Sequence, residues 1–191
     1  MSETSEPRVL LPLFLDVTGR NVLVVGGGTI AARKALELAL ARAKVHVVAP
    51  HIAPELRAAA SDSLTLEERT FEERDLDGVW LVFAATDDAA VQRRIKGECE
   101  RARVFCVAVD DPPNASAYGG AIVRRGPVTI AISTSGEAPA LARLLREILE
   151  QVLPDEGYVE AARALREKWK AEKTPMASRF GELVVAFKAR P

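Results

Sequence analysis

Short apolar runs recur through the first part of the chain, separated by longer stretches of mixed polarity. Runs at residues 21–25, 44–49, 79–85 and 104–109 predict strands, and the unbroken apolar character of the last two is typical of strands buried on both faces. Residues 64–69 (LTLEER) alternate between apolar and polar positions, which predicts a strand at the edge of a sheet.

The stretches between these runs show the helical spacing of apolar residues. Helices are predicted at residues 29–42, at 53–60 and from Asp87 or Asp88 to about 101, and either aspartate is suited to cap the last one. Strands that alternate with helices in this way predict an α/β fold with a doubly wound parallel sheet. Such sheets bind their ligands at the carboxyl ends of the strands.

The pattern changes after Asp111, where the turn-rich sequence PPNASAYGG places a boundary near residue 114. Beyond it the pattern predicts one strand and three helices, at residues 128–133, 141–153, 159–173 and 177–188. The chain is therefore expected to have three parts, residues 1–113, 114–153 and 154–191.

The composition excludes several classes of protein. The 191 residues are 48% hydrophobic and 28% charged, with a net charge of −1, so neither nucleic acid nor a membrane is an expected partner. No signal peptide and no membrane-spanning run is visible, which predicts a cytoplasmic location. Cys99 and Cys106 lack the spacing of a redox pair or a zinc site, so no resident metal is expected.

The sequence NVLVVGGGTIAARKA, from Asn21 onward, places three glycines between a predicted strand and a predicted helix. Gly26, Gly28 and Ala31 have the G-x-G-x-x-A spacing of a dinucleotide-binding turn. Gly26 suits the sharp turn, Gly28 lets a pyrophosphate approach the backbone, and Ala31 lets the helix lie close to the strand. The free N–H groups of the first helical turn then favour an anion. A nucleotide-free tight turn is the alternative interpretation.

The acidic residue that often binds the NAD ribose, about 20 residues past the glycines, is absent here. That position reads Val48, Ala49, Pro50, His51, so the residues alone leave NAD and NADP open. Backbone groups near Pro50 and His51 are candidates for holding the ribose. A surface position explains His51 equally well.

Asp110 ends a predicted buried strand on the side of the sheet where the cofactor is expected. A carboxylate there is suited to take or hold a proton during redox chemistry. The alternative is a cap of a turn or helix, a role that fits Asp111 better because Pro112 follows it.

The hydroxyl groups of Thr134 and Ser135 lie between a predicted strand and a predicted helix. Thr134 and Glu137 have the spacing of a capping box, so these hydroxyls either cap the helix or bind a carboxylate.

A group of arginines stands out in this otherwise balanced chain. Arginine side chains suit carboxylate ligands, although a solvated face has a similar pattern. The group consists of Arg124, Arg125, Arg143 and Arg146.

Several segments in order carry a resemblance to a known family: LPLFLDVTGRNVLVVGGGTIAARKA, VFAATDD, VFCVAVDDP, AIVRRGPVTIAIST and PALARLLREILE. Together they span residues 10 to about 153. On these segments the chain resembles precorrin-2 dehydrogenase, the first module of sirohaem synthase.

The resemblance implies a Rossmann-like NAD-binding domain, then a small α+β dimerisation domain, then a C-terminal helical domain. The implied reaction oxidises the tetrapyrrole precorrin-2 to sirohydrochlorin, with NAD as the cofactor. Some members then insert Fe²⁺ to give sirohaem, so iron is expected as a substrate at most. The implied assembly is a homodimer.

The resemblance also implies site residues. The essential aspartate of the family matches Asp110, and a serine in the dimerisation domain of one bacterial member matches Thr134. Because the implied substrate carries many carboxylates, Arg124, Arg125, Thr134 and Ser135 are expected to bind it. The NAD contacts match Gly26, Gly27, Gly28, Thr29, Ile30, Pro50, His51 and Thr86. Two other functions stay open at this point: a module that senses NAD(H) without turnover, and a dehydrogenase for another polyanionic substrate.

Overall fold

A computed structural model of the chain describes residues 9–109, 111–153 and 156–188. The chain forms two compact units that divide between Gly119 and Gly120. The three-part division expected from the sequence stays a prediction. The elements of the first unit are β1 (Asn21–Val25), α1 (Thr29–Leu40), β2 (Lys44–Ala49), α2 (Pro54–Ala58), β3 (Leu64–Glu68), the 3-10 turn η1 (Glu73–Leu76), β4 (Leu81–Ala84), α3 (Ala89–Ala102), β5 (Phe105–Ala108) and the 3-10 turn η2 (Pro112–Asn114).

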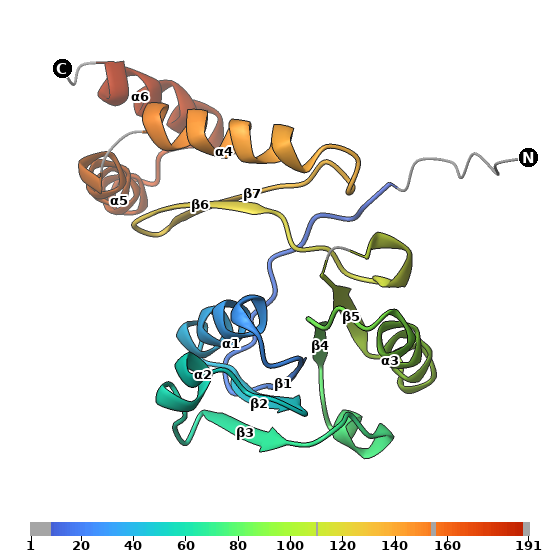
Figure 1. Cartoon of the computed structure of the whole chain (residues 1–191). Helices are drawn as coiled ribbons and strands as arrows, with labels where there is room; N and C mark the ends of the chain where they lie inside the picture. Colours follow the sequence, from blue (N-terminus) through green and yellow to red (C-terminus); the bar gives the residue numbers. More distant parts are fainter. Residues whose placement is uncertain (1–8, 110, 154–155, 189–191) are drawn as a thin grey trace, which may run out of the picture. The chain divides into compact units, whose positions relative to one another are not determined.

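The first unit is a five-stranded parallel sheet in the order β3-β2-β1-β4-β5 (Figure 1). The predicted α/β fold is confirmed, and so is the edge position of β3. The chain reverses its direction of winding at β1, where β2 lies on one side and β4 on the other. This reversal is the point at which doubly wound sheets bind ligands.

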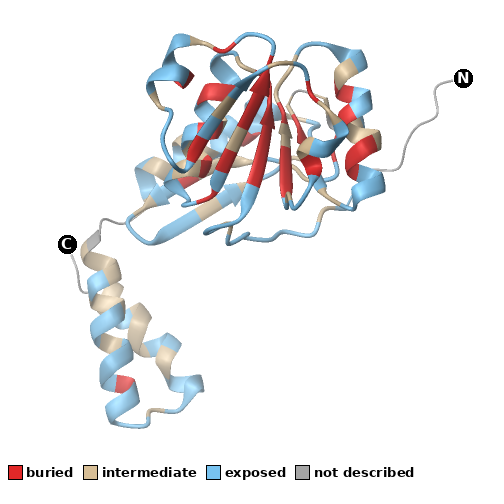
Figure 2. Cartoon of the chain, turned by 90° about the horizontal axis from the view of Figure 1, so that it is seen from below, coloured by how far each residue is buried: buried red, intermediate tan, exposed pale blue. Residues whose placement is uncertain are grey.

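Apolar side chains cover both faces of this sheet, and buried residues concentrate on its strands (Figure 2). Alternate residues of β1 serve the two faces: Val22 and Val24 pack toward α1 and α2, whereas Leu23 and Val25 pack toward α3 and η1. A parallel strand needs this unbroken apolar pattern because no face of it meets water.

Asp88 is the N-cap of α3. It is one of the two aspartates that the sequence offered for this role. Its carboxylate accepts hydrogen bonds from the backbone N–H groups of Ala90 at 2.8 Å and Val91 at 3.2 Å. These bonds satisfy donors that the first turn of a helix leaves free. The start of α3 is thereby fixed beside the end of β4.

The second unit begins with an antiparallel hairpin. Its elements are β6 (Ala121–Arg125), β7 (Val128–Ile132), α4 (Pro139–Val152), α5 (Glu156–Ala171) and α6 (Met176–Lys188). The strand β6 was not predicted from the sequence. It pairs with the predicted β7 in a register that sets Val123 opposite Ile130. Among the described residues, no helix is both long and apolar enough to cross a membrane.

Candidate functional site

The glycine turn joins β1 to α1 in the manner that its spacing predicts. Gly26 has a φ of +131°, and a Cβ there would lie 2.1 Å from the carbonyl oxygen of Ala85. Gly28 is the N-cap of α1, and an added Cβ would meet nothing within 4 Å. No side chain in the described part of the chain caps this helix. Its first N–H groups are therefore left without a side-chain acceptor, which suits an anion such as a pyrophosphate.

The structure shows why residue 27 is also a glycine, a reason that the sequence did not reveal. A Cβ on Gly27 would lie 1.9 Å from the carbonyl oxygen of His51. The Gly27 carbonyl also accepts a hydrogen bond from the Ala53 N–H at 2.8 Å. The loop after β2 thus crosses directly over the glycine turn, and only a residue without a side chain permits that approach.

The predicted cofactor residues come from three adjacent strands. Gly26 to Ile30 follow β1, Pro50 and His51 follow β2, and Thr86 follows β4. Since β2, β1 and β4 are neighbours and parallel, these segments meet at one edge of the sheet. Both Pro50 and His51 are exposed. The residues present therefore fit a dinucleotide, although which of them contact it stays a prediction.

A pocket of about 330 Å³ opens at this edge, beside the ends of β4 and β5. Ile30 reaches it from α1, and Gln92 reaches it from α3. Its lining consists of Ile30, Ala85, Thr86, Asp87, Ala89, Gln92, Val109 and Asp111. Sequence reasoning did not single out Gln92, which reads as an ordinary polar residue on a helix.

Asp110, the predicted catalytic residue, lies outside the residues that the structure describes. Its neighbour Asp111 lines the pocket and also stabilises a turn. The Asp111 carboxylate accepts a hydrogen bond from the Asn114 side chain, and the Asp111 carbonyl accepts one from the Asn114 N–H at 3.0 Å. This agrees with the capping role that the sequence favoured for Asp111.

The predicted substrate-binding arginines belong to the second unit and differ in their surroundings. Arg124 is exposed. Arg125 donates a hydrogen bond from its guanidinium to the Glu150 carbonyl oxygen at 2.7 Å, which ties the end of β6 to the end of α4. Arg125 thus has a structural bond in addition to any ligand contact.

Thr134 and Ser135 lie in the loop between β7 and α4. The Thr134 hydroxyl accepts a hydrogen bond from the Ala138 N–H at 3.2 Å, and Ser135 has a φ of +54°. The helix begins at Pro139 with Ala138 as its N-cap, so Thr134 is not the N-cap that the capping-box spacing suggests. Pro139 occupies the first helical position, where its missing N–H costs no hydrogen bond.

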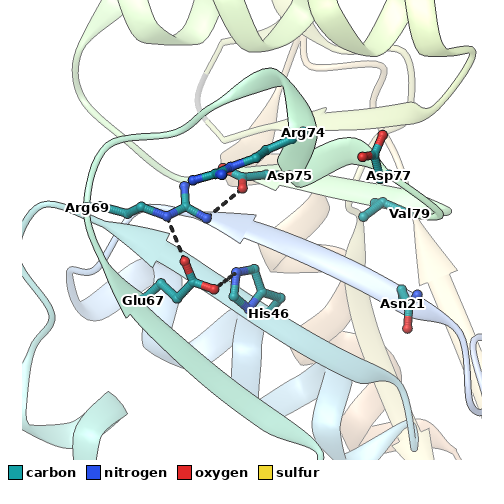
Figure 3. Close-up of a pocket in the computed structure, with 8 residues that line it drawn as sticks. All are labelled: Asn21, His46, Glu67, Arg69, Arg74, Asp75, Asp77 and Val79. Carbon is teal, nitrogen blue, oxygen red and sulfur yellow. Dashed lines mark hydrogen bonds and ion pairs between the residues drawn. The ribbon is translucent and has the colours of Figure 1, made fainter.

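A second pocket, of about 470 Å³, lies on the face of the sheet that carries η1 (Figure 3). It is lined by Asn21, His46, Glu67, Arg69, Arg74, Asp75, Asp77 and Val79. Asn21 begins β1, whereas the glycine turn follows its last residue. This pocket is therefore separate from the edge where dinucleotides bind.

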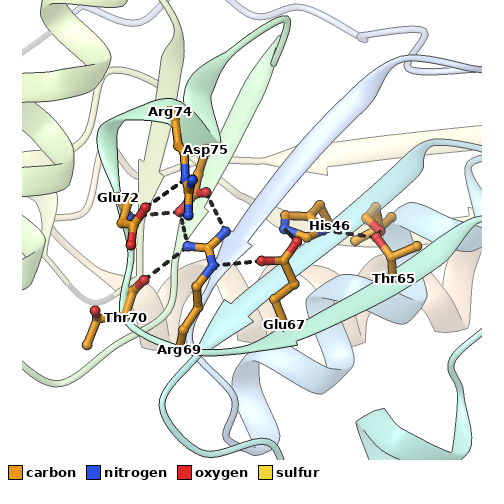
Figure 4. A network of polar contacts seen from close by, with 9 residues as sticks. His46, Thr65, Glu67, Arg69, Thr70, Glu72, Arg74 and Asp75 are labelled. Atoms are coloured by element: carbon orange, nitrogen blue, oxygen red, sulfur yellow. Dashed lines mark hydrogen bonds and ion pairs between the residues drawn. The ribbon is translucent and has the colours of Figure 1, made fainter.

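Four of the side chains that line this second pocket pair with one another: His46, Glu67, Arg69 and Asp75 (Figure 4). Arg69 contacts the Glu67 carboxylate at 2.6 Å, and Glu67 in turn lies 3.4 Å from His46 Nε2. Arg69 also forms an ion pair with Asp75, whose side chain is 3% exposed. Burial raises the pKa of Asp75, but hydrogen bonds from Arg69 and from the Glu72 N–H outweigh it and lower that pKa overall. The mutual pairing indicates a structural network.

Potential metal ligands do not gather anywhere in the described part of the chain. No group of three or more His, Cys, Asp or Glu side chains lies close enough together there to hold a metal ion.

Comparison with known proteins assigns the two parts of the chain to different family models. Residues 13–121 match the model described as "Putative NAD(P)-binding", and residues 125–151 match "Sirohaem biosynthesis protein central". The first match covers the whole sheet and its glycine turn. The second covers the end of the hairpin and most of α4.

Several siroheme synthases are similar in sequence. Siroheme synthase 1 of Aeromonas hydrophila subsp. hydrophila is 42% identical over 172 residues, which cover 88% of this chain and 37% of that protein. The siroheme synthase of Citrobacter koseri is 46% identical over 145 residues, which cover 75% and 32%. The chain thus spans about a third of the length of these relatives.

A solved structure of SirC, precorrin-2 dehydrogenase, is similar in fold, with a TM-score of 0.72 and 26% sequence identity. The similarity covers 92% of this chain and 88% of that one. The likeness therefore extends through both units.

Proposed function

We propose that this chain, which belongs to the putative NAD(P)-binding family, oxidises precorrin-2 to sirohydrochlorin with NAD⁺. The segment that matches the sirohaem-biosynthesis central model follows the NAD(P)-binding part in the sequence. The observation that carries the proposal is the extent of the likeness to SirC, precorrin-2 dehydrogenase. A shared nucleotide-binding sheet alone would indicate a fold rather than a reaction. A likeness through the hairpin and helices that follow the sheet supports the same activity.

The glycine turn is the part of the chain that would hold the cofactor. The uncapped N–H groups at the start of α1 would bind the pyrophosphate, since nothing fills the space beside Gly28. Pro50 and His51 would hold the adenosine ribose from the end of β2, and Thr86 would contact the cofactor from the end of β4. The bound cofactor supplies a hydride acceptor, and the chain supplies position and orientation.

The substrate loses two hydrogens, as a hydride and a proton. We assign the proton to Asp110, which follows the pocket-lining residue Val109 in the sequence. A carboxylate is a suitable acceptor for a proton that leaves with the hydride. This assignment is based on the sequence and on the resemblance to the family.

The substrate is a polyanion, and arginine is the side chain that binds carboxylates most specifically. We propose Arg124 as a carboxylate contact because its guanidinium is exposed, and Thr134 and Ser135 as hydroxyl contacts. Arg125 would contribute through its charge, since its guanidinium already holds the Glu150 carbonyl.

The test is a turnover assay with the purified chain, precorrin-2 and NAD⁺, followed by the absorbance of NADH. Stoichiometric NADH and sirohydrochlorin are expected. Binding of NADH without turnover of precorrin-2 would instead favour a sensor of NAD(H), and turnover of a different polyanion would favour another dehydrogenase. Addition of Fe²⁺ to the same reaction shows whether the protein also makes sirohaem.

We further propose that the protein is a homodimer that uses the apolar face of α4. Five apolar side chains share this face at helical spacing, and all are exposed: Leu141, Leu144, Leu145, Ile148 and Val152. Another side of α4 packs on β6 and β7, with Ala142 buried. An apolar stripe of this length is typical of a surface that is covered by a second chain.

We also propose a cytoplasmic location. Cys99 and Cys106 are both buried and both free, and their side chains contact each other. Buried cysteines that form no disulfide are typical of a protein in a reducing compartment.

A further inference from the structure

Gln92 is a buried polar side chain at the edge of the candidate nucleotide pocket. Its residue is 6% exposed, although glutamine on a helix normally faces solvent. Gln92 Nε2 donates one hydrogen bond to the Thr86 carbonyl oxygen at 2.8 Å and a longer one to the Val109 carbonyl oxygen at 3.4 Å. A single amide group thus bridges two separate segments of the chain.

These two carbonyls belong to different segments of the chain that line the pocket. Thr86 follows β4 and Val109 follows β5, and both residues line the pocket. The ladder between these strands ends with the pair Ala84 and Ala108. Gln92 therefore joins the two strands beyond their ladder, at the place where the backbone turns away to form the pocket.

The oxygen of the same amide has no hydrogen-bond partner among the described residues. Gln92 Oε1 is buried, and no hydrogen-bond donor in the described part of the chain reaches it. The orientation of the amide follows from its surroundings, because two carbonyl oxygens require the NH₂ group on their side. A buried acceptor without a donor is costly and rare in folded proteins, so its position beside a pocket points to a donor supplied by a ligand.

We propose that Gln92 positions the walls of the dinucleotide pocket through Nε2 and accepts, through Oε1, a hydrogen bond from an N–H or O–H group of the bound dinucleotide. The dinucleotide offers such donors on its carboxamide and its ribose hydroxyls. This inference rests on the proposed NAD-dependent function. It adds a residue that neither the glycine motif nor the spacing of the family segments indicates.

The experiment measures the dissociation constant of NADH for the full chain by isothermal titration calorimetry, independently of turnover. In Gln92→Met the side chain keeps its length but loses both donor and acceptor. We expect NADH to bind at least about tenfold more weakly, and the KM for NAD⁺ to rise while that for precorrin-2 is unchanged. Gln92→Asn keeps the amide on a shorter side chain and should fall between wild type and Gln92→Met.

Gln151→Met is the matched control, because Gln151 is an exposed glutamine on α4. It should bind NADH like the wild type. Thermal unfolding without NADH identifies a temperature at which all variants are folded, and affinities are compared there. If folded Gln92→Met and Gln92→Asn both bind NADH within about twofold of wild type, the role of Gln92 is purely structural and the inference is wrong. If the wild type itself does not bind NADH, the proposed function fails first.

Discussion

Arg69 donates two hydrogen bonds to the carboxylate of Asp75, at 2.8 and 2.6 Å, and so ties the end of β3 to the turn η1. The connection between β3 and β4 passes to the other face of the sheet. It contains a 3-10 turn, whereas parallel strands are usually connected by a longer helix. The bidentate pair fixes this short crossover.

Replacing Asp75 with alanine should lower the free energy of unfolding by about 2 kcal/mol, because it removes two hydrogen bonds between charged groups and leaves Arg69 with Glu67 as its remaining carboxylate partner. Urea denaturation measures the change. Arg57→Ala is the control, since Arg57 pairs with Glu68 through exposed side chains and should change the stability much less. A loss no larger than that of the control would show that the pair does not stabilise the crossover.

The same carboxylate predicts a pH dependence of stability. The pKa of Asp75 is lowered in the folded chain, so its contribution is complete above the unfolded pKa of about 3.9 and is lost as pH falls through the folded value. The free energy of unfolding of wild type should therefore fall more steeply than that of Asp75→Asn below about pH 4. Denaturation at a series of pH values compares them, and parallel curves would contradict the assignment.

Gly28→Ala should separate cofactor binding from folding. The φ of −84° at Gly28 suits alanine, and the added Cβ meets no atom within 4 Å, so the melting temperature should stay near that of wild type. The methyl group would occupy the space beside the uncapped start of α1, and NADH should bind at least about tenfold more weakly.

Gly97→Ala is the matched control for that variant. Gly97 lies within α3, and its added Cβ also meets nothing within 4 Å. Alanine in a helix is more favourable than glycine by up to about 1 kcal/mol, so this variant should be slightly more stable and bind NADH normally. Normal NADH binding by both variants would show that the pyrophosphate lies elsewhere.

Asp110→Asn tests the proposed proton acceptor. The kcat for precorrin-2 oxidation should fall by about a hundredfold or more, while the dissociation constant of NADH is unchanged. The amide cannot take a proton, but its shape is that of the carboxylate. Asp111→Asn provides the comparison, since Asp111 belongs to the turn with Asn114 and should keep more activity. Wild-type turnover by Asp110→Asn would remove this residue from the mechanism.

Leu144→Glu should convert the proposed homodimer into monomers. Leu144 is 52% exposed and lies on the apolar face of α4, so a charge there opposes burial against a second chain without disturbing the fold. Light scattering after size-exclusion chromatography measures the mass. Arg143→Glu, on a neighbouring exposed position that already pairs with Glu147, controls for surface charge. A monomeric wild type would refute the proposal directly.

Local pattern was sufficient for much of the fold. The strands β1 and β2 occupy the residues that their apolar runs predict. A short apolar run that is bounded by polar residues and by glycine or proline is typical of a buried strand. The glycine turn and the start of the helix after it likewise depend only on residues that are close together in the sequence. Asp88 caps α3 for the same local reason.

Other features depended on segments that are distant in the sequence. The strand β6 exists through its pairing with β7, and Arg125 gains a partner only where α4 ends. Gln92 reads as a surface residue until β4 and β5 bring Thr86 and Val109 around it. The sequence by itself thus determined most of the elements, though not β6, and the glycine turn, since these depend on short-range sterics and periodicity. Only the tertiary structure decided which polar groups are buried, because burial depends on which elements meet.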